Sequence, residues 1–447
     1  MAILSQLDDI RDVEIRNSSG ALTDNLIYNM REDGDCKYLF IANGRREMKD
    51  EKLTYLPRKE RLRPFYKDVV DVNDVIIKIT GEYCPVLMDT LTGECSEVAF
   101  ETKDGFTYIP YSFYAHDSVL LKLVEGKKAH SCNEPKYEEI KRIDFRRPVK
   151  YVMHEPNVLV LDTAQYALDD EPLNESEGIL RIDDIIRGRL GLERADGCQA
   201  QPWVFGEKPP QNTVTLKFEV CSEIECEAEL AYEEMVYLNI NGIELEVKDE
   251  GYYVDKSIHK MKIPMLKRGI NEIIVKTPIG ERVSVENYYL LGDFGVRVNG
   301  CQSIIQKKND KITFGTITNQ GMPFYGGNVT YITEFETNND AVVEIEATYF
   351  RGDLIGVALD GENIGDIIIM PYSIRLPKLE KGKHTLEFTL YGNRFNTFGA
   401  LHNCGDNDWP GPEIWYTKDS EWCYEYNVKE TGILKSPVIR MLEEKKI

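Results

Sequence analysis

The sequence predicts an all-β protein made of tandem β-sandwich domains with one short helical insertion. Two observations lead to this fold class. Most periodic segments are short, rich in β-branched residues and often alternate with polar ones, and Gly, Asn, Asp and Pro separate them at short intervals. Many short strands with such punctuation are typical of β-sandwiches. The strand-like segments are residues 75–81, 119–124, 157–161, 213–220, 272–277, 342–347 and 385–390.

The one convincing helical pattern covers residues 179–192, which read ILRIDDIIRGRLGL. Their apolar residues fall three and four positions apart, as expected for a helix with one buried face. The surrounding segment is rich in Asp, Glu and Asn, so we expect the helix to lie in an insertion.

An internal repeat relates residues 262–277 (KIPMLKRGINEIIVKT) to residues 375–390 (RLPKLEKGKHTLEFTL) at an offset of 113. Each copy follows a strand and turn that end in Asn-Gly or Asp-Gly. The repeat indicates two domains of the same sandwich type in tandem, and the alternative is a chance recurrence of turn residues. The matched residues are Pro264, Leu266 and Gly269 in the first copy and Pro377, Leu379 and Gly382 in the second.

The chain of 447 residues is long enough for about three domains at roughly 150 residues each. Residues 1–30 are expected to be a lead-in from an upstream domain, and residues 31–136 a first β-sandwich. Residues 137–300 would form a jelly roll that carries the helical insertion, and residues 301–447 a second jelly roll.

The charge balance argues against two classes of partner. With 54 basic and 76 acidic residues, the formal net charge is −22 and the pI is about 4.9. Such a surface repels nucleic-acid phosphates and anionic membranes, whereas neutral ligands such as sugars remain compatible. There is no run of about 20 apolar residues and no basic, apolar leader at the N-terminus, so we expect a cytoplasmic protein.

A cluster of aromatic residues near the C-terminus is the candidate binding site. Trp409, Trp415 and Trp422 lie within fourteen residues, together with Asn and Asp residues. Sugars bind where an aromatic ring meets amides and carboxylates, because they present apolar C–H faces as well as hydroxyl groups. The alternative is a core or inter-domain aromatic cluster. The residues expected to contact sugar are Trp409, Trp415, Trp422, Tyr325, Asn403 and Asp408.

No catalytic residue, metal site or cofactor is predicted. Asp406-Asn407-Asp408 resembles the start of an EF-hand loop, but Thr417 stands where that loop needs an acid. A structural calcium ion elsewhere stays open without a position. The six histidines are dispersed, and no nucleotide-binding, nucleophile-elbow or zinc motif is present. With 76 acidic residues, a pair of carboxylates in the sequence carries almost no information.

Several segments resemble large bacterial glycoside hydrolases of the α-L-rhamnosidase type. Residues 26–43 (LIYNMREDGDCKYLFIAN) look like the passage from the catalytic barrel into the sandwich that follows it. Residues 85–94 (PVLMDTLTGE) are similar to a turn of that sandwich, and residues 114–121 (YAHDSVLL) to its closing strand. Further similar segments are residues 157–166, 201–203, 286–296, 321–331, 390–403 and 415–437.

The resemblance implies that the second and third domains are galactose-binding-like jelly rolls. It also implies that the catalytic residues lie on a barrel that would precede residue 1, so none is carried over. The chain would be a carbohydrate-binding accessory region that supports this barrel, with a rhamnose-containing plant polysaccharide and a catalytic-barrel chain as partners. Two alternatives stay open: a purely structural scaffold or partner subunit without a ligand, and a self-contained glycosidase that uses surface carboxylates.

Overall fold

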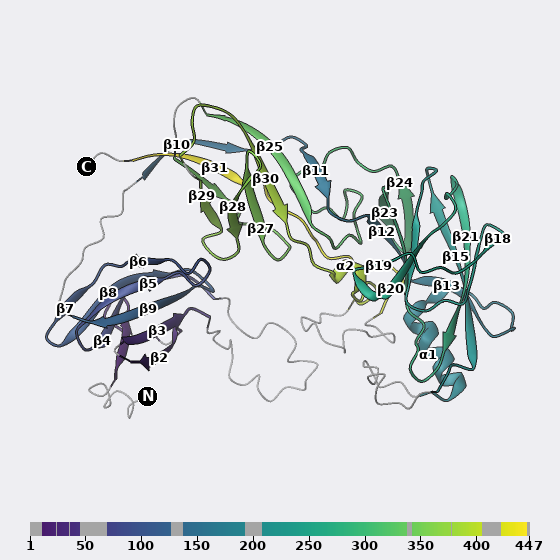
Figure 1. Cartoon of the computed structure of the whole chain (residues 1–447), viewed down its shortest axis with the longest axis horizontal. Coiled ribbons are helices and arrows are strands. Elements are labelled where there is room, and N and C mark those ends of the chain that lie inside the picture. Colours follow the sequence, from purple (N-terminus) through teal and green to yellow (C-terminus); the bar gives the residue numbers. More distant parts are fainter. Residues whose placement is uncertain are drawn as a thin grey trace.

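The computed structural model describes residues 11–23, 25–34, 36–44, 69–126, 137–192, 208–337, 342–376, 378–404 and 422–444. Within these ranges the chain is almost entirely β (Figure 1). It has 31 strands, which form antiparallel sheets, and two short helices. Three separate cores lie between these sheets, which confirms the predicted series of β-sandwiches. No helix within the described ranges has the length and apolar character needed to cross a membrane.

The first sandwich alternates buried and exposed residues along its central strands, and the buried set forms one core. One sheet has the order β1 (Val13–Arg16), β4 (Val72–Thr80), β8 (Phe106–Phe113) and β7 (Glu101–Lys103). The other has the order β2 (Ile27–Asp33), β3 (Cys36–Ala42), β9 (Ser118–Glu125), β5 (Tyr83–Met88) and β6 (Cys95–Glu97). Because β1 pairs with β4, residues of the predicted lead-in belong to this sandwich.

The second sandwich contains the largest core. One sheet has the order β12 (Asn157–Leu161), β22 (Tyr288–Gly292), β16 (Glu229–Tyr232), β20 (Asp255–Lys262) and β19 (Tyr252–Tyr253). The other has the order β14 (Glu177–Gly178), β13 (Thr163–Leu168), β15 (Asn212–Ser222), β21 (Gly269–Ile279), β17 (Tyr237–Ile240) and β18 (Ile243–Leu245). Strand β24 (Gln302–Gln306) joins it beside β15 and also pairs with β23 (Gly295–Asn299).

The predicted helix is α1 (Ile179–Leu190), which ends at Gly191 in the left-handed conformation that glycine favours. Its residues Ile179, Ile182 and Ile186 pack into the core of the second sandwich, in agreement with the three-and-four spacing of the sequence. Asp183 and Arg187 form a buried ion pair of 2.9 Å on the same helix.

The third sandwich pairs strands from two distant parts of the chain. One sheet has the order β10 (Tyr137–Asp144), β31 (Val438–Glu444), β26 (Val342–Glu346) and β29 (Ser373–Arg375). The other has the order β11 (Lys150–Met153), β25 (Val329–Thr337), β30 (Gly382–Leu390), β27 (Ile355–Leu359) and β28 (Glu362–Ile367). A single turn of helix, α2 (Phe395–Phe398), follows β30.

These pairings change the predicted domain boundaries. Residues 137–153 were expected in the second domain, but β10 and β11 are edge strands of the third sandwich. Residues 301–306 were expected in the third domain, but β24 pairs with β15 of the second. The second sandwich is therefore inserted between β11 and β25 of the third, and the chain leaves the third sandwich and returns to it (Figure 1).

The internal repeat corresponds to equivalent sheets. The order β15, β21, β17, β18 in the second sandwich matches β25, β30, β27, β28 in the third. Both hairpins turn at two residues with positive φ, Asn241-Gly242 and Asp360-Gly361, as in tight two-residue turns. The Asn241 and Asp360 side chains accept hydrogen bonds from the backbone N–H of Glu272 and Thr385, which are 113 residues apart. The repeat is thus structural; Pro377 lies outside the described residues.

Candidate functional site

Three of the six residues expected to contact sugar, Trp409, Trp415 and Asp408, lie outside the described residues, and their role stays a prediction. The other three are Trp422, Asn403 and Tyr325. The structure brings Trp422 and Asn403 together in an isolated antiparallel bridge and places Tyr325 elsewhere.

Tyr325 is a core residue and not a sugar-contacting one. It is 2% exposed and packs into the core of the third sandwich. Its hydroxyl accepts hydrogen bonds from the backbone N–H of His154 (3.1 Å) and Glu155 (3.2 Å) and donates to the carbonyl of Asn328 (2.9 Å). Burial raises the pKa of this phenol to about 12. Tyr325 therefore ties the segment that leaves β11 to the third sandwich.

Trp422 lies in the segment between α2 and β31 and packs against the helix of the second sandwich. The Arg181 guanidinium of α1 lies 4.4 Å from the Trp422 ring centroid, and the Tyr424 ring meets it edge to face at 4.4 Å. The edge of the indole also lies close to Gly178, where an added Cβ would come within 3.2 Å of it. This is the inter-domain aromatic packing that the sequence left open as the alternative to sugar stacking.

Beside Trp422, three side chains tie the segment after α2 to the second sandwich. The Asp162 carboxylate, just after β12, accepts a hydrogen bond from the Tyr426 hydroxyl at 2.7 Å and lies 3.1 Å from His402 Nε2. The other ring nitrogen of His402 lies 3.3 Å from the carbonyl oxygen of Glu425. Both nitrogens thus face acceptors, which only the protonated imidazolium satisfies.

The electrostatics of this cluster agree with its geometry. Burial disfavours a charged His402 ring, but the hydrogen bond and charge of Asp162, with the nearby carbonyls, outweigh it and raise the pKa of His402 above its ordinary value. Burial and the same carboxylate also raise the pKa of Tyr426, well above that of a free phenol. We call Asp162, His402 and Tyr426 the interface triad.

The cavity at this interface is too small for a sugar. Its volume is about 30 Å³, which suits a water molecule. Asp162, His402 and Trp422 line it together with Asn287 and Asn403. The Asn287 Oδ1 and Asn403 Nδ2 atoms are buried and have no hydrogen-bonding partner among the described residues, so one acceptor and one donor face a space of that size.

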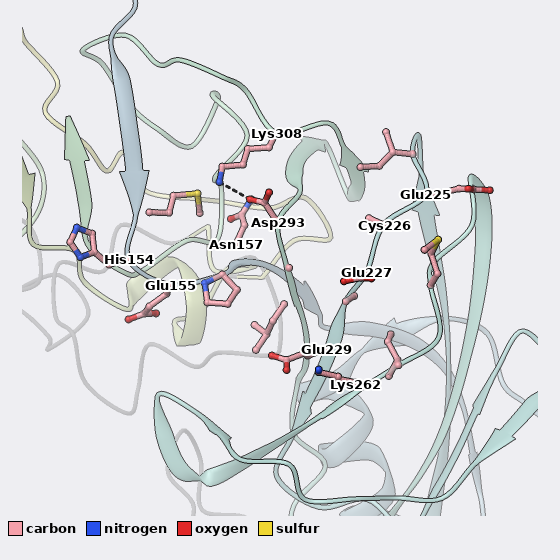
Figure 2. A pocket seen from close by; sticks show the side chains of 18 residues that line it. His154, Glu155, Asn157, Glu225, Cys226, Glu227, Glu229, Lys262, Asp293 and Lys308 are labelled. Atoms are coloured by element: carbon pink, nitrogen blue, oxygen red, sulfur yellow. Dashed lines mark hydrogen bonds and ion pairs between the residues drawn. The ribbon is translucent and has the colours of Figure 1, made fainter. Parts of the chain in front are cut away.

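A much larger groove, of about 990 Å³, lies where the chain enters the second sandwich. Residues 153–157 between β11 and β12 form one wall, and residues 224–229 before and within β16 form the other (Figure 2). Residues 262–265 and 291–293 close the groove. Apolar side chains of Ile224, Met265 and Pro156 stand beside the polar ones, so the lining is mixed. We call this space the entry groove.

Asn157 lies at the wall of the entry groove with its side-chain amide almost fully covered. It is 2% exposed, and its Nδ2 donates to the carbonyls of Phe294 and Gly321, both at 2.8 Å. These two bonds fix which side of the amide is oxygen. Asn157 Oδ1 is buried and has no partner in the described part of the chain.

The charges of the entry groove are mostly acidic. Lys308 pairs with Asp293 at 2.6 Å (Figure 2). Lys260, which does not line the groove, pairs with the lining residue Glu229 at 2.9 Å. Glu225 and Glu227 are exposed and have no ion-pair partner among the described residues. Within the described ranges, no three His, Cys, Asp or Glu side chains are placed to share a metal ion. The groove therefore presents mostly acceptors, with the exposed ammonium of Lys262 as a donor.

No family model matches this chain, and no curated protein matches it either. Among solved structures, it is similar to the rhamnosidase from Novosphingobium sp. PP1Y, with 10% sequence identity and a TM-score of 0.44 over 98% of this chain and 26% of that one. It is also similar to a glycosyl hydrolase family 2 member from Bacteroides cellulosilyticus, with 8% identity and a TM-score of 0.16 over 55% of this chain and 32% of that one. This chain thus spans a third or less of both proteins.

Sequence reasoning missed the residues that shape these sites. Asn157 heads an otherwise apolar strand, NVLVL, and a polar residue in that position is the signal that could have singled it out. Asp162 directly follows the same strand. Nothing local in the sequence indicates that His402 and Tyr426 reach it, because they lie about 240 and 264 residues further along the chain.

Proposed function

We propose that this chain is a carbohydrate-binding accessory region of a glycoside hydrolase and holds neutral sugar units of a plant polysaccharide in the entry groove. The observation that carries the proposal is the pair of exposed carboxylates, Glu225 and Glu227, which have no ion-pair partner among the described residues and lie in a groove that also offers apolar side chains. Sugar hydroxyls are donors that such acceptors hold, and the apolar side chains suit the C–H face of the ring.

The net charge of −22 supports a neutral ligand, since it opposes the approach of anions. A rhamnose-containing polysaccharide and a catalytic-barrel chain are the partners that the sequence resemblance suggests, and both belong to the proposal. Catalysis would reside on that barrel, and the sandwiches would hold the polymer near it.

Affinity electrophoresis of the purified chain tests this function, with rhamnogalacturonan, arabinogalactan and xylan in the gels. We expect one polymer to retard the chain. The double variant Glu225→Gln and Glu227→Gln should weaken that retardation at least tenfold, because hydrogen bonds to charged groups contribute about 1.5–3 kcal/mol each. Both side chains are exposed and unpaired in the described structure, so the variant should fold.

Glu244→Gln is the matched control, because Glu244 is an exposed glutamate of β18 on the same sandwich. No retardation by any polymer, or equal retardation of the double variant, would overturn the entry groove as a sugar site. Loss of retardation in Trp409→Ala or Trp415→Ala, with the double variant unaffected, would move the site to the predicted tryptophan cluster.

A second candidate is a structural scaffold without a ligand. The contacts of Trp422 and of the interface triad favour this candidate. These aromatic and charged groups bond to other parts of the chain and hold the fold together. It predicts no retardation by any polymer in the panel.

A further inference from the structure

A second groove lies on the third sandwich and shares no lining residue with the entry groove. Its volume is about 840 Å³, within the range of small-molecule sites. Four segments border it: residues 348–353 between β26 and β27, residues 368–372 between β28 and β29, residues 393–395 after β30, and residues 429–431. We call it the loop groove.

The backbone of the loop groove is held in place. Arg351 and Gly432 exchange two backbone hydrogen bonds of 2.9 and 3.0 Å. The Asp353 N–H donates to the carbonyl of Tyr391 at 2.8 Å. Buried Asn396 bonds both the N–H and the carbonyl of Lys429, at 2.9 and 2.8 Å. The walls are therefore preorganised, which lowers the ordering cost of binding.

Four of the five charged side chains on these walls are, in contrast, available; the fifth, Arg394, pairs with Glu155. Arg351, Asp353, Lys429 and Glu430 are exposed, and none has an ion-pair partner among the described residues. The Arg351 guanidinium donates only to the neighbouring carbonyl of Phe350 at 3.3 Å. Two cations and two anions give these four groups a net charge of zero in a chain of −22, so they select neither a phosphate nor a cation.

An aromatic ring completes the loop groove. Tyr349 is 46% exposed, and the Arg351 guanidinium lies 5.3 Å from its centroid. Phe350 and Tyr372 also line the groove; their rings meet each other edge to face at 5.6 Å and pack against the core of the third sandwich. An exposed ring beside both donors and acceptors matches a pyranose, which has apolar C–H faces and hydroxyls that donate and accept.

We propose that the loop groove binds a neutral pyranose unit, with Tyr349 as the stacking ring and Asp353 and Arg351 as hydroxyl contacts. The chain then carries two carbohydrate sites, one on each of two sandwiches. Two linked sites on one polymer raise the overall affinity above that of either alone. The inference rests on the proposed function for the ligand class, but the loop groove can be tested separately.

Isothermal titration of the full chain with neutral monosaccharides and their oligomers (L-rhamnose, D-galactose, L-arabinose and D-xylose) tests the proposal. We expect two sites per chain in the wild type and one in Tyr349→Ala. Asp353→Asn should weaken the same site at least tenfold. Tyr252→Ala is the matched control, because Tyr252 is 55% exposed on the second sandwich and lines neither groove.

The variants separate this inference from the proposed function. If Tyr349→Ala and Asp353→Asn leave stoichiometry and affinity unchanged while the double variant of Glu225 and Glu227 abolishes binding, the loop groove is overturned and the entry groove stands. If binding depends on Tyr349 alone, the loop groove stands and the entry groove is overturned. Absence of binding for every sugar overturns both.

Discussion

Replacing His402 by glutamine should loosen the attachment of the segment after α2 to the second sandwich, and should do so more at low pH than at high pH. In the wild type, the protonated ring bonds Asp162 of the second sandwich and the Glu425 carbonyl of its own segment after α2. Glutamine keeps one donor for the Asp162 carboxylate but loses the positive charge. Asp162 would then be a buried anion held by the Tyr426 hydroxyl and a neutral amide.

The magnitude follows from the burial of the pair. The side chains of His402 and Asp162 are 12% and 6% exposed, so the pair belongs to the buried class, where removal of one partner costs about 3–5 kcal/mol. Tyr426 and the glutamine amide still bond Asp162 in the variant. We therefore expect a loss of unfolding free energy at the lower end of this range, about 3 kcal/mol at pH 6. For a unit of this size, that corresponds to a fall in Tm of about 6–12 °C.

The pH dependence has a definite sign. The pKa of His402 is raised in the folded protein above the ordinary value of about 6.5. Its stabilising contribution is therefore complete below about pH 6.5 and is lost as the pH rises through the folded pKa. Scanning calorimetry at pH 6 and pH 9 should show a gap in Tm between wild type and His402→Gln that narrows at pH 9.

His384→Gln is the matched control. The His384 ring also faces two acceptors, Asp360 Oδ2 at 2.8 Å and the Glu380 carbonyl at 2.9 Å, but all three residues lie within the third sandwich. Asp360 is 49% exposed, so this variant should lose no more than about 1 kcal/mol. Two results would refute a protonated His402 ring. One is a difference in Tm between wild type and His402→Gln that is equal at both pH values, and the other is a difference no larger than that for His384→Gln.

Two further substitutions test how the sandwiches are held. Arg187→Met should lower the free energy of unfolding by about 3–5 kcal/mol, because it removes the cation that pairs with the buried Asp183 carboxylate on α1. Urea unfolding measures this loss, and a midpoint equal to that of the wild type would contradict the prediction. Tyr325→Phe should cost about 1–3 kcal/mol, because the backbone N–H of Glu155 loses its acceptor, whereas that of His154 keeps the Asn328 carbonyl at 3.1 Å. Faster amide exchange at Glu155 is the expected readout, and unchanged exchange there would count against it.

The local features of the fold could be predicted from the sequence because they depend on neighbouring residues. Strands such as VIIKITG bury every second residue, so their period reveals a sheet with one inward face. The Asn-Gly and Asp-Gly turns of the repeat fix their hairpins through a positive φ that few other residues adopt. The same holds for α1, whose apolar residues return to one face of the helix.

Features that depend on distant partners could not be predicted. The strand YEEIKRID carries mostly exposed residues, and nothing in it indicates that its partner is β31 rather than a neighbour in the sequence. Tyr325 is equally compatible with a core and a sugar platform, since only the fold decides whether the ring is covered. Asn157 gains significance only once Phe294 and Gly321 fix its amide.

The insertion of one sandwich within another imposes an order on synthesis. Strands β10 and β11 leave the ribosome before the second sandwich, but their partners β31 and β25 follow only after that sandwich has been made. Until then both strands have open hydrogen-bonding edges, which invite aggregation. Strand β10 carries five charged side chains, which keep this open edge soluble until β31 has been made. In the folded protein β10 is still an edge strand of its sheet. The five residues are Glu138, Glu139, Lys141, Arg142 and Asp144.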